Sequence, residues 1–182
     1  MIGVSHVTCM AVRPEVIMDD KNRETLRSLV AEFHTGMLVT KAPEGLRARP
    51  MSVAKLETND DLFFAASVDS GKVKEIEDDH EVVVTFQSKT AYVSLSGPAR
   101  AVTDPAVIAK YWSEPMRVWF PKGPTDPSLC LIQMRPAQGE FWNVEGAKGL
   151  RYIFEAAKAY VTGTTPKTAP DQHGEVGDVA SH

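Results

Sequence analysis

The sequence holds little that could build a disulfide framework or a metal centre. Its only two cysteines, Cys9 and Cys130, lie far apart and form no Cys-x-x-Cys pair, so neither a disulfide framework nor a zinc site is expected. The five histidines are scattered without metal-ligand spacing, and we expect no bound metal. A reduced, cytoplasmic setting is the expected location. Cys130 lies in a short apolar run, which is typical of a buried thiol.

Long apolar runs and an excess of positive charge are also missing. No run approaches the roughly 20 apolar residues that a membrane-spanning helix needs, and residues 1–12 lack the basic start of a secretory signal. The formal net charge is -4 and the isoelectric point is near 5.7, whereas nucleic acids and anionic membranes select basic surfaces. We therefore expect neither nucleic acid nor a membrane as a partner.

Familiar catalytic motifs do not occur in the sequence. It has no Gly-x-Ser-x-Gly elbow, no Gly-x-Gly-x-x-Gly loop and no Walker-type loop. The acidic pairs Asp60-Asp61 and Asp78-Asp79 lie at predicted turns, where solvated capping is the expected role. Because no nucleophile stands with a base, any chemistry would be carried by a bound organic cofactor.

The chain does have enough apolar content for one domain. At 182 residues and 43% hydrophobic content, it can bury a proper core. We place this domain at residues 20–163, after an N-terminal extension at residues 1–19. Residues 164–182 are rich in Thr, Pro, Gly, Asp and His, with few groups to bury, and we predict a disordered C-terminal tail there.

Short strand-like runs separated by turns dominate the domain. Strand and helix do not alternate strictly, so a small antiparallel barrel with helices at its edges is favoured over a parallel doubly wound sheet. The predicted strands are Met37–Thr40, Leu46–Leu56, Leu62–Ala66, Val82–Phe86, Tyr92–Val102, Leu129–Arg135 and Gly139–Val144. The predicted helices run from Asp20 to near Gly36, over Gly71–Asp78, onward from Asp104-Pro105, and over Leu150–Val161. Gly97-Pro98 predicts a bulge or sharp bend in the longest strand.

An irregular segment, Pro115 to Pro127, carries two aromatic residues, Trp119 and Phe120. Large aromatic side chains gain most when they are packed against other groups. We therefore expect this loop to cover a ligand or a partner subunit.

Two stretches suggest a binding site. In Arg47-Ala48-Arg49-Pro50-Met51, an extended backbone places both arginines and the methionine on one face. In Ser67-Val68-Asp69-Ser70-Gly71-Lys72, hydroxyls and a lysine stand where a strand turns into a helix, and free N–H groups there favour an anion. Together the stretches could form a phosphate cradle. They could equally be an edge strand with solvated arginines and a helix cap at Asp69 or Ser70.

The sequence also resembles a known group, the FMN-binding split β-barrel superfamily typified by pyridoxamine 5′-phosphate oxidase, and within it the bacterial general stress protein branch. The resemblance covers roughly Leu26 to Gly163 and rests on six segments in the same order. These segments are Gly36–Thr40, Arg47–Met51, Leu62–Phe64, Asp69–Val73, Trp119–Gly123 and Glu140–Trp142.

This resemblance implies a mainly β (α+β) fold, a six-stranded antiparallel split β-barrel with flanking helices, and a homodimer that holds FMN at its interface. The implied cofactor-binding residues are Arg49, Pro50, Met51, Ser52, Phe64, Ala65, Ser67, Ser70, Lys72, Tyr92 and Trp142. Arg49, Lys72 and the serine hydroxyls would hold the phosphate, and the strand after Arg49 would run beside the flavin ring. Trp142 would reach the ring across the dimer interface, or would be an ordinary core aromatic.

One departure limits the implied activity. The oxidases grip their substrate with an Arg-x-His motif after the tryptophan, and residues 143–152 contain no such histidine. We therefore expect an FMN-binding stress-response or redox protein without pyridoxamine phosphate oxidase activity. The alternatives are an oxidoreductase of a small substrate that uses FMN or a deazaflavin, and a non-catalytic dimer scaffold. Whether the protein is an enzyme stays open.

Overall fold

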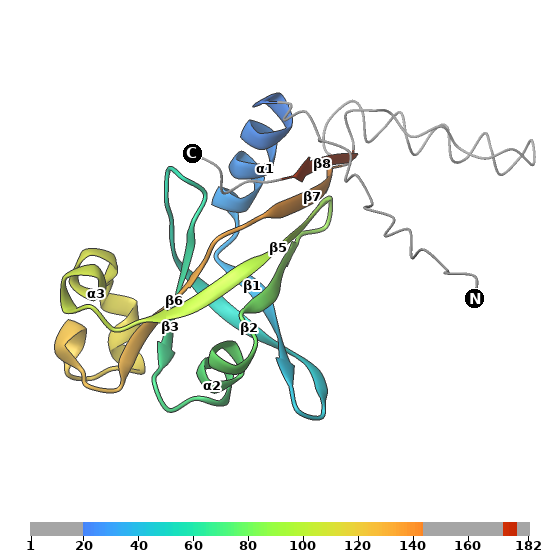
Figure 1. The fold of residues 1–182 in the computed structure, drawn as a ribbon. Coiled ribbons are helices and arrows are strands. Elements are labelled where there is room, and N and C mark those ends of the chain that lie inside the picture. Colours follow the sequence, from blue (N-terminus) through green and yellow to red (C-terminus); the bar gives the residue numbers. More distant parts are fainter. Residues whose placement is uncertain (1–19, 144–172, 178–182) are drawn as a thin grey trace, which may run out of the picture.

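The computed structural model describes residues 20–143 and 173–177 (Figure 1). Its strands are β1 (Thr35–Ala42), β2 (Gly45–Leu56), β3 (Leu62–Ser67), β4 (Glu81–Gln87), β5 (Ala91–Val102), β6 (Leu129–Met134), β7 (Gln138–Asn143) and β8 (His173–Gly177). Its helices are α1 (Asp20–Glu32), α2 (Gly71–Asp78) and α3 (Pro105–Tyr111), followed by two short 3₁₀ turns, η1 (Glu114–Val118) and η2 (Gly123–Thr125).

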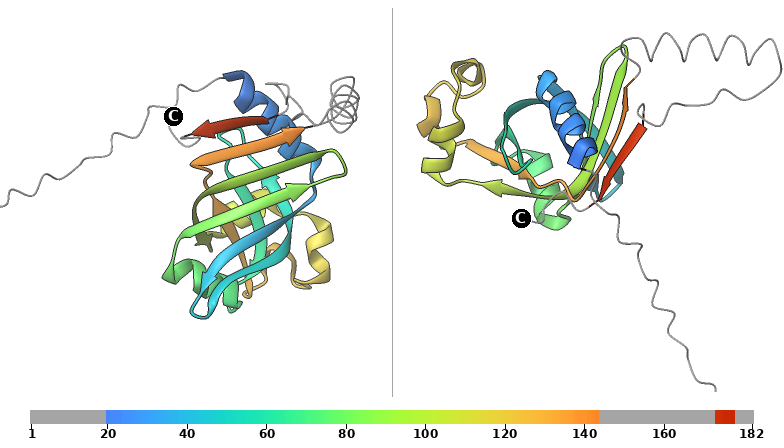
Figure 2. Two further views of the ribbon diagram at one scale, coloured as in Figure 1. Left: turned by 90° about the vertical axis from the view of Figure 1, so that its right-hand side faces the viewer. Right: turned by 90° about the horizontal axis from the view of Figure 1, so that it is seen from above.

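Six strands close into an antiparallel barrel. They pair in the order β4-β1-β2-β3-β6-β5, and a β4–β5 ladder closes the ring. β7 and β8 extend the sheet outward from β5, so they lie outside the ring (Figure 2). The mainly β fold with a six-stranded antiparallel barrel and flanking helices, expected from the sequence, is confirmed.

β5 connects the barrel to its extension because its two halves have different partners. Its first half, from Ala91 to Ser96, pairs with β7, and its second half, from Ala99 to Val102, pairs with β6. The change of partner takes place at Gly97, whose φ of +156° is one that side chains rarely allow. A Cβ there would collide with the carbonyl oxygen of Arg135 and lie 2.7 Å from the amide nitrogen of Ala137. The predicted bend at Gly97 is confirmed.

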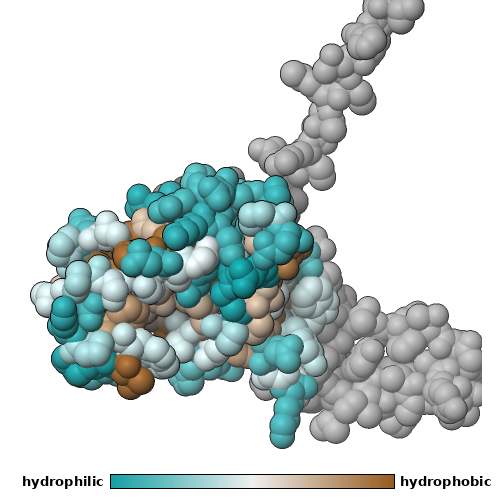
Figure 3. Space-filling view, turned by 90° about the horizontal axis from the view of Figure 1, so that it is seen from below, coloured by the Kyte–Doolittle hydropathy of each residue, from teal (hydrophilic) through white to brown (hydrophobic). Residues whose placement is uncertain are grey.

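Two helices cover opposite ends of the barrel, α1 above and α2 below in Figure 1, and Figure 3 shows the molecule from below, from the α2 side. Their apolar faces contribute to one continuous core. Leu26, Leu29 and Val30 from α1, and Val73 and Ile76 from α2, share this core with inward-facing residues of every barrel strand and of β7. The 3.6-residue spacing of these side chains explains why both segments form helices against the barrel.

A second cluster packs on the outer face of β3 and β6. Phe120 is buried there with Phe63, Ile108 and Met116, while its neighbour Trp119 is 69% exposed. The segment expected to be an irregular cover thus contains two 3₁₀ turns, and Phe120 covers the chain's own sheet. At the start of α3, the Asp104 side chain accepts a hydrogen bond from the Ala106 amide at 2.8 Å, as the predicted cap requires.

The C-terminal region contains one strand that the sequence did not predict. β8 pairs with β7 and falls within residues 164–182, the segment expected to be a disordered tail. The predicted helix at Leu150–Val161 lies outside the described residues. Within residues 20–143 and 173–177, no helix is both long and apolar enough to cross a membrane.

Gly97→Ala should lower the free energy of unfolding by about 2–4 kcal/mol, since strain at positive φ costs about 1–3 kcal/mol and overpacking adds about 1–3. Urea unfolding measures the loss. Gly45→Ala is the matched control, because Gly45 also has positive φ (+132°) but no atom within 4 Å of a Cβ. Equal losses in the two variants would contradict the proposed close approach of β5 to the β6–β7 corner.

Candidate functional site

The barrel is open between β2 and β3 near α2. The two strands pair from Leu56 opposite Leu62 to Val53 opposite Phe64, with a register shift between Val53 and Lys55. Beyond that point β2 pairs only with β1, and β3 pairs only with β6. Pro50, on the diverging part of β2, has no N–H to donate to a β3 partner. Backbone edges of both strands therefore face each other without a ladder, which is the split in the barrel.

Arg49 is largely buried at the α2 end of the barrel, and the exposed Arg47 reaches the same acid, Glu75, as the alternation predicts for residues on one face. Arg49 donates to Glu75 Oε2 at 2.8 Å and to Thr40 Oγ1 at 2.6 Å. Thr40 donates to the same Glu75 oxygen at 2.5 Å, and Arg47 donates to Oε1 at 3.2 Å. Glu75 is only 6% exposed. The interpretation of these arginines as solvated edge residues is therefore wrong for Arg49, which lies within a largely buried network.

Lys72 completes a cationic group at the first turn of α2. It is half-buried, and the structure shows no hydrogen bond or ion pair for its ammonium group within the described residues. Burial lowers its pKa from the usual 10.5, and the neighbouring charge of Arg49 lowers it further. The shift shows that the two cations lie within electrostatic reach of each other. Three cations here (Arg47, Arg49, Lys72) meet two acids, the buried Glu75 and the exposed Glu44, which lies 3.7 Å from Arg47, so one positive charge remains in excess.

Ser70 occupies the N-cap position of α2 but does not act as a cap. Its side chain makes no capping hydrogen bond, and its Oγ is buried without a partner within the described residues. Buried hydroxyls without partners are rare because each costs free energy. Ser67 is close along the chain, and its carbonyl accepts the Ser70 amide at 3.0 Å. The unpaired hydroxyl, the excess positive charge and the start of α2 fit an anionic group such as a phosphate.

The other predicted contacts on β2 and β3 divide by face. Met51 and Phe64 point into the core, so only their backbone is available to a ligand at the split. Pro50 and Ser52 are exposed on the outer face of β2, and Ala65 is half-buried on the outer face of β3. The outer faces of the two diverging strands thus provide small side chains and backbone, against which a flat ring could lie.

Tyr92 and Trp142 lie elsewhere on the molecule. They are register partners on β5 and β7, and both are exposed on the outer face, 46% and 38% respectively. In the ring of six strands β5 stands opposite β2, three steps away in either direction. One chain therefore does not bring these aromatics to Arg49 and Lys72. The alternative of Trp142 as an ordinary core aromatic is also wrong.

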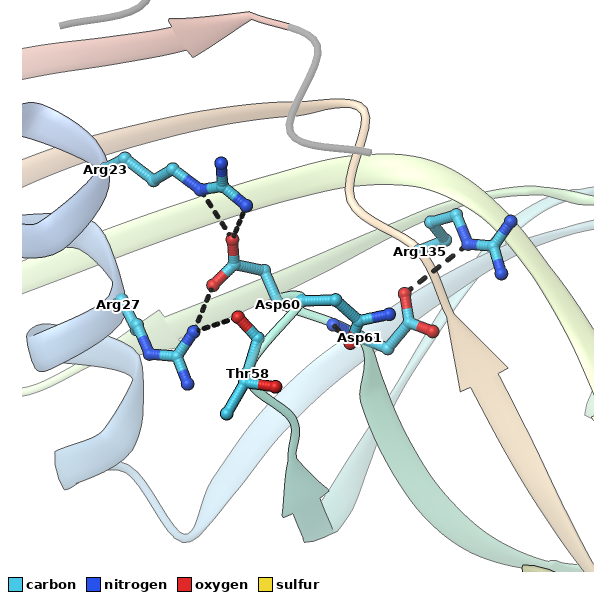
Figure 4. Close-up of polar contacts among 7 residues, drawn as sticks. Arg23, Arg27, Thr58, Asp60, Asp61 and Arg135 are labelled. Atoms are coloured by element: carbon cyan, nitrogen blue, oxygen red, sulfur yellow. Dashed lines mark hydrogen bonds and ion pairs between the residues drawn. The ribbon is translucent and has the colours of Figure 1, made fainter. Parts of the chain in front are cut away.

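Sequence reasoning missed the acidic residues that organise both ends of the barrel. The sequence does not indicate a role for Glu75, because its spacing from Val73 and Asp78 on α2 carries no signal of its contacts with β1 and β2. Asp60 and Asp61 were expected to be solvated, but they are 7% and 3% exposed. Asp60 binds Arg23 at 2.7 Å and Arg27 at 3.1 Å, both from α1 (Figure 4). An ion pair between residues this far apart in the chain leaves no local pattern in the sequence.

Comparison with known proteins places the chain in a family. The fold defines the broad class, a small split-barrel protein. A family model described as pyridoxamine 5′-phosphate oxidase like matches residues 21–167, and the chain belongs to that family. Protein bli-3 from Neurospora crassa is 28% identical over 134 residues, and the match spans 66% of this chain and 64% of that relative's length.

Solved structures agree with the general stress protein branch expected from the sequence. A putative general stress protein 26 from Jannaschia sp. CCS1 has 25% identity and a TM-score of 0.68, with 87% of this chain and 99% of that chain covered. A general stress FMN/FAD binding protein from Xanthomonas citri has 26% identity and a TM-score of 0.60, with 70% of this chain and 92% of that chain covered. The resemblance to this branch is thereby confirmed.

Glu75 should make stability sensitive to acid. Burial acts to raise its pKa, but hydrogen bonds from Thr40 and Arg49 and the charges of both arginines outweigh burial and hold the pKa below the usual 4.5. A lowered folded pKa contributes stability above pH 4.5, which is lost as the pH falls through the folded value. Glu75→Gln should therefore be less stable than wild type at neutral pH, with the difference shrinking under acid. Urea midpoints measured from neutral pH down to about pH 3 test this.

The exposed Glu77 on the same helix supplies the control Glu77→Gln. A parallel pH profile for Glu75→Gln and wild type would show that the Glu75 network contributes nothing to acid sensitivity.

Proposed function

We propose that this protein binds FMN and acts as a flavin-dependent redox or stress-response protein. The observation that carries the proposal is the group at the α2 end of the split: Lys72, which has no ion pair within the described residues, and Arg49 beside the unpartnered, buried Ser70 hydroxyl. A flavin phosphate would supply the anion that these three groups can bind. Family membership and a general stress relative named for FMN/FAD binding support a flavin as the bound cofactor.

In this proposal, each residue has a distinct role at the phosphate end. Lys72 and Arg49 supply charge-assisted donors, and Ser67 and Ser70 supply hydroxyls. Rotation of the Ser70 side chain would bring its hydroxyl out of its buried position towards the ligand. Glu75 holds Arg49 in place, so the guanidinium is ordered before a ligand arrives, which reduces the entropy lost on binding. The bound flavin would supply the redox chemistry.

The flavin ring would lie between two copies of the chain. Arg49 lies on β2, and Tyr92 and Trp142 lie on β5 and β7, on the opposite side of the barrel. A second copy can bring its own Tyr92 and Trp142 to the split of the first, and twofold symmetry then builds two equivalent sites. We therefore propose a homodimer with FMN at its interface. Oxidation of pyridoxamine 5′-phosphate is not part of the proposal, because residues 143–152 lack the histidine of the oxidase motif.

Lys72→Ala should weaken FMN binding by roughly ten- to a hundredfold, the loss expected for one hydrogen bond to a charged group. Flavin fluorescence quenching during titration of the apoprotein measures the affinity. Lys74→Ala, which removes an exposed lysine from the same helix, is the matched control and should bind FMN as wild type does. FMN should also bind much more tightly than FAD, because a phosphate held by Arg49, Lys72 and the Ser67–Ser70 turn leaves little room for an attached adenylate. Equal affinities for the two flavins, or an unchanged affinity in Lys72→Ala, would contradict the phosphate assignment.

The protein should sediment as a dimer at micromolar concentration, and FMN should strengthen that dimer by mass action. Analytical ultracentrifugation with and without FMN measures this. Tyr92→Ala combined with Trp142→Ala should weaken FMN binding even though both residues are remote from Lys72 within one chain. A monomer under both conditions would refute the shared site.

A further inference from the structure

The outer surface where β5 meets β6 contains a cavity of about 380 Å³. It is lined by His80, Pro98, Ala99, Arg100, Gln133 and Arg135. This volume falls in the lower part of the range for small-molecule sites. None of the lining residues belongs to the proposed flavin site, and the inference below does not depend on FMN binding.

We propose that this cavity binds a small organic anion that carries a carboxylate or a phosphate group. Arg100 is held by a hydrogen bond from its Nε atom, and the half-exposed Arg135 forms a longer ion pair through the same atom. Arg100 Nε donates to Gln133 Oε1 at 2.9 Å, and Arg135 Nε lies 3.5 Å from Asp61 Oδ1. Within the described residues the structure shows no partner for the terminal nitrogens of either guanidinium, and Figure 4 shows those of Arg135 turned away from Asp61.

Gln133 gives this arrangement its rigidity. It is only 9% exposed, and its Nε2 donates to Asp61 Oδ2 at 2.5 Å while its Oε1 accepts from Arg100. The buried amide thus fixes Arg100 on one side and Asp61 on the other. A guanidinium that is ordered in advance and has a free fork of donors suits a carboxylate or phosphate, which it can bind with two parallel hydrogen bonds.

Charge and shape favour an anion with a short carbon skeleton. Arg100 and Arg135 carry two positive charges, and the buried Asp61 offsets only one of them. The nearby His80 donates its Nδ1–H to the Ile76 carbonyl at 2.7 Å, which leaves Nε2 to meet a ligand. Pro98 and Ala99 supply an apolar wall.

The fold creates the cavity through the bend of β5. At Gly97 the strand passes directly against the β6–β7 corner, where the Arg135 amide donates to the Pro98 carbonyl at 2.9 Å. This contact places Arg135 beside Arg100 although the two residues are far apart in the sequence. The same constraint that closes the barrel therefore brings the two arginines to one cavity.

The test is a titration of the ¹⁵N-labelled full chain, followed by amide chemical shifts. Succinate and inorganic phosphate are added separately, with sodium chloride holding the ionic strength constant. The proposal predicts saturable shifts at the amides of Arg100 and Arg135 with at least one of the two anions. Saturation by succinate alone identifies a carboxylate ligand, and tighter saturation by phosphate identifies a phosphate ligand.

Variants separate this cavity from the flavin site. Arg100→Gln and Arg135→Gln should each weaken the anion at least tenfold, whereas Lys89→Gln, which removes an exposed charge from the β4–β5 turn, should not. Lys72→Ala should abolish only those phosphate-induced shifts that arise on α2. The proposal is overturned if neither anion gives saturable shifts at Arg100 and Arg135, or if both arginine variants bind as wild type does.

Discussion

Closure of the barrel depends on β5, which must pair with three strands. It pairs with β4 along one edge, and along the other it passes from β7 to β6 at Gly97. A side chain at this position would collide with backbone of the β6–β7 corner, and backbone cannot move aside as a flexible side chain can. Without this approach β5 and β6 would separate and the ring would open. The cavity beside Arg100 and Arg135 and the outward extension through β7 both follow from the same bend.

The closed ring leaves two ends, and each end is covered by a helix and a buried acid. At the α2 end Glu75 receives Thr40, Arg47 and Arg49, and at the α1 end Asp60 receives Arg23 and Arg27. A buried carboxylate is tolerable only when donors surround it. The two ends nevertheless differ in their unused groups. Both have more cations than acids, but at the α2 end Lys72 has no ion pair and the Ser70 hydroxyl has no partner within the described residues, which makes it the end that we propose for the flavin phosphate.

Sequence patterns predicted most of the fold because its determinants are local. The alternation in β2, the apolar run of β4, the cap at Asp104 and the bend at Gly97 each lie within a few neighbouring residues. The candidate site could be predicted in part for the same reason, since Ser67 to Lys72 form one turn. Glu75 could not, because its partners are 26 to 35 positions away. Asp60 was expected to be solvated because it lies in a predicted turn, whereas α1 folds back to cover it.

The closed barrel also limits how one chain can bind a flat cofactor. A small barrel has a filled interior, so a ligand must lie on the outside, where one sheet face covers only one side of it. The split between β2 and β3 offers such a face with small side chains, and its opposite strand β5 carries the exposed Tyr92 beside Trp142. These two surfaces lie on opposite sides of one barrel and cannot meet within a chain, but the twofold axis of the proposed dimer would bring them together in pairs. In that dimer both faces of the flavin ring would be buried, and cofactor binding and association would be one coupled equilibrium.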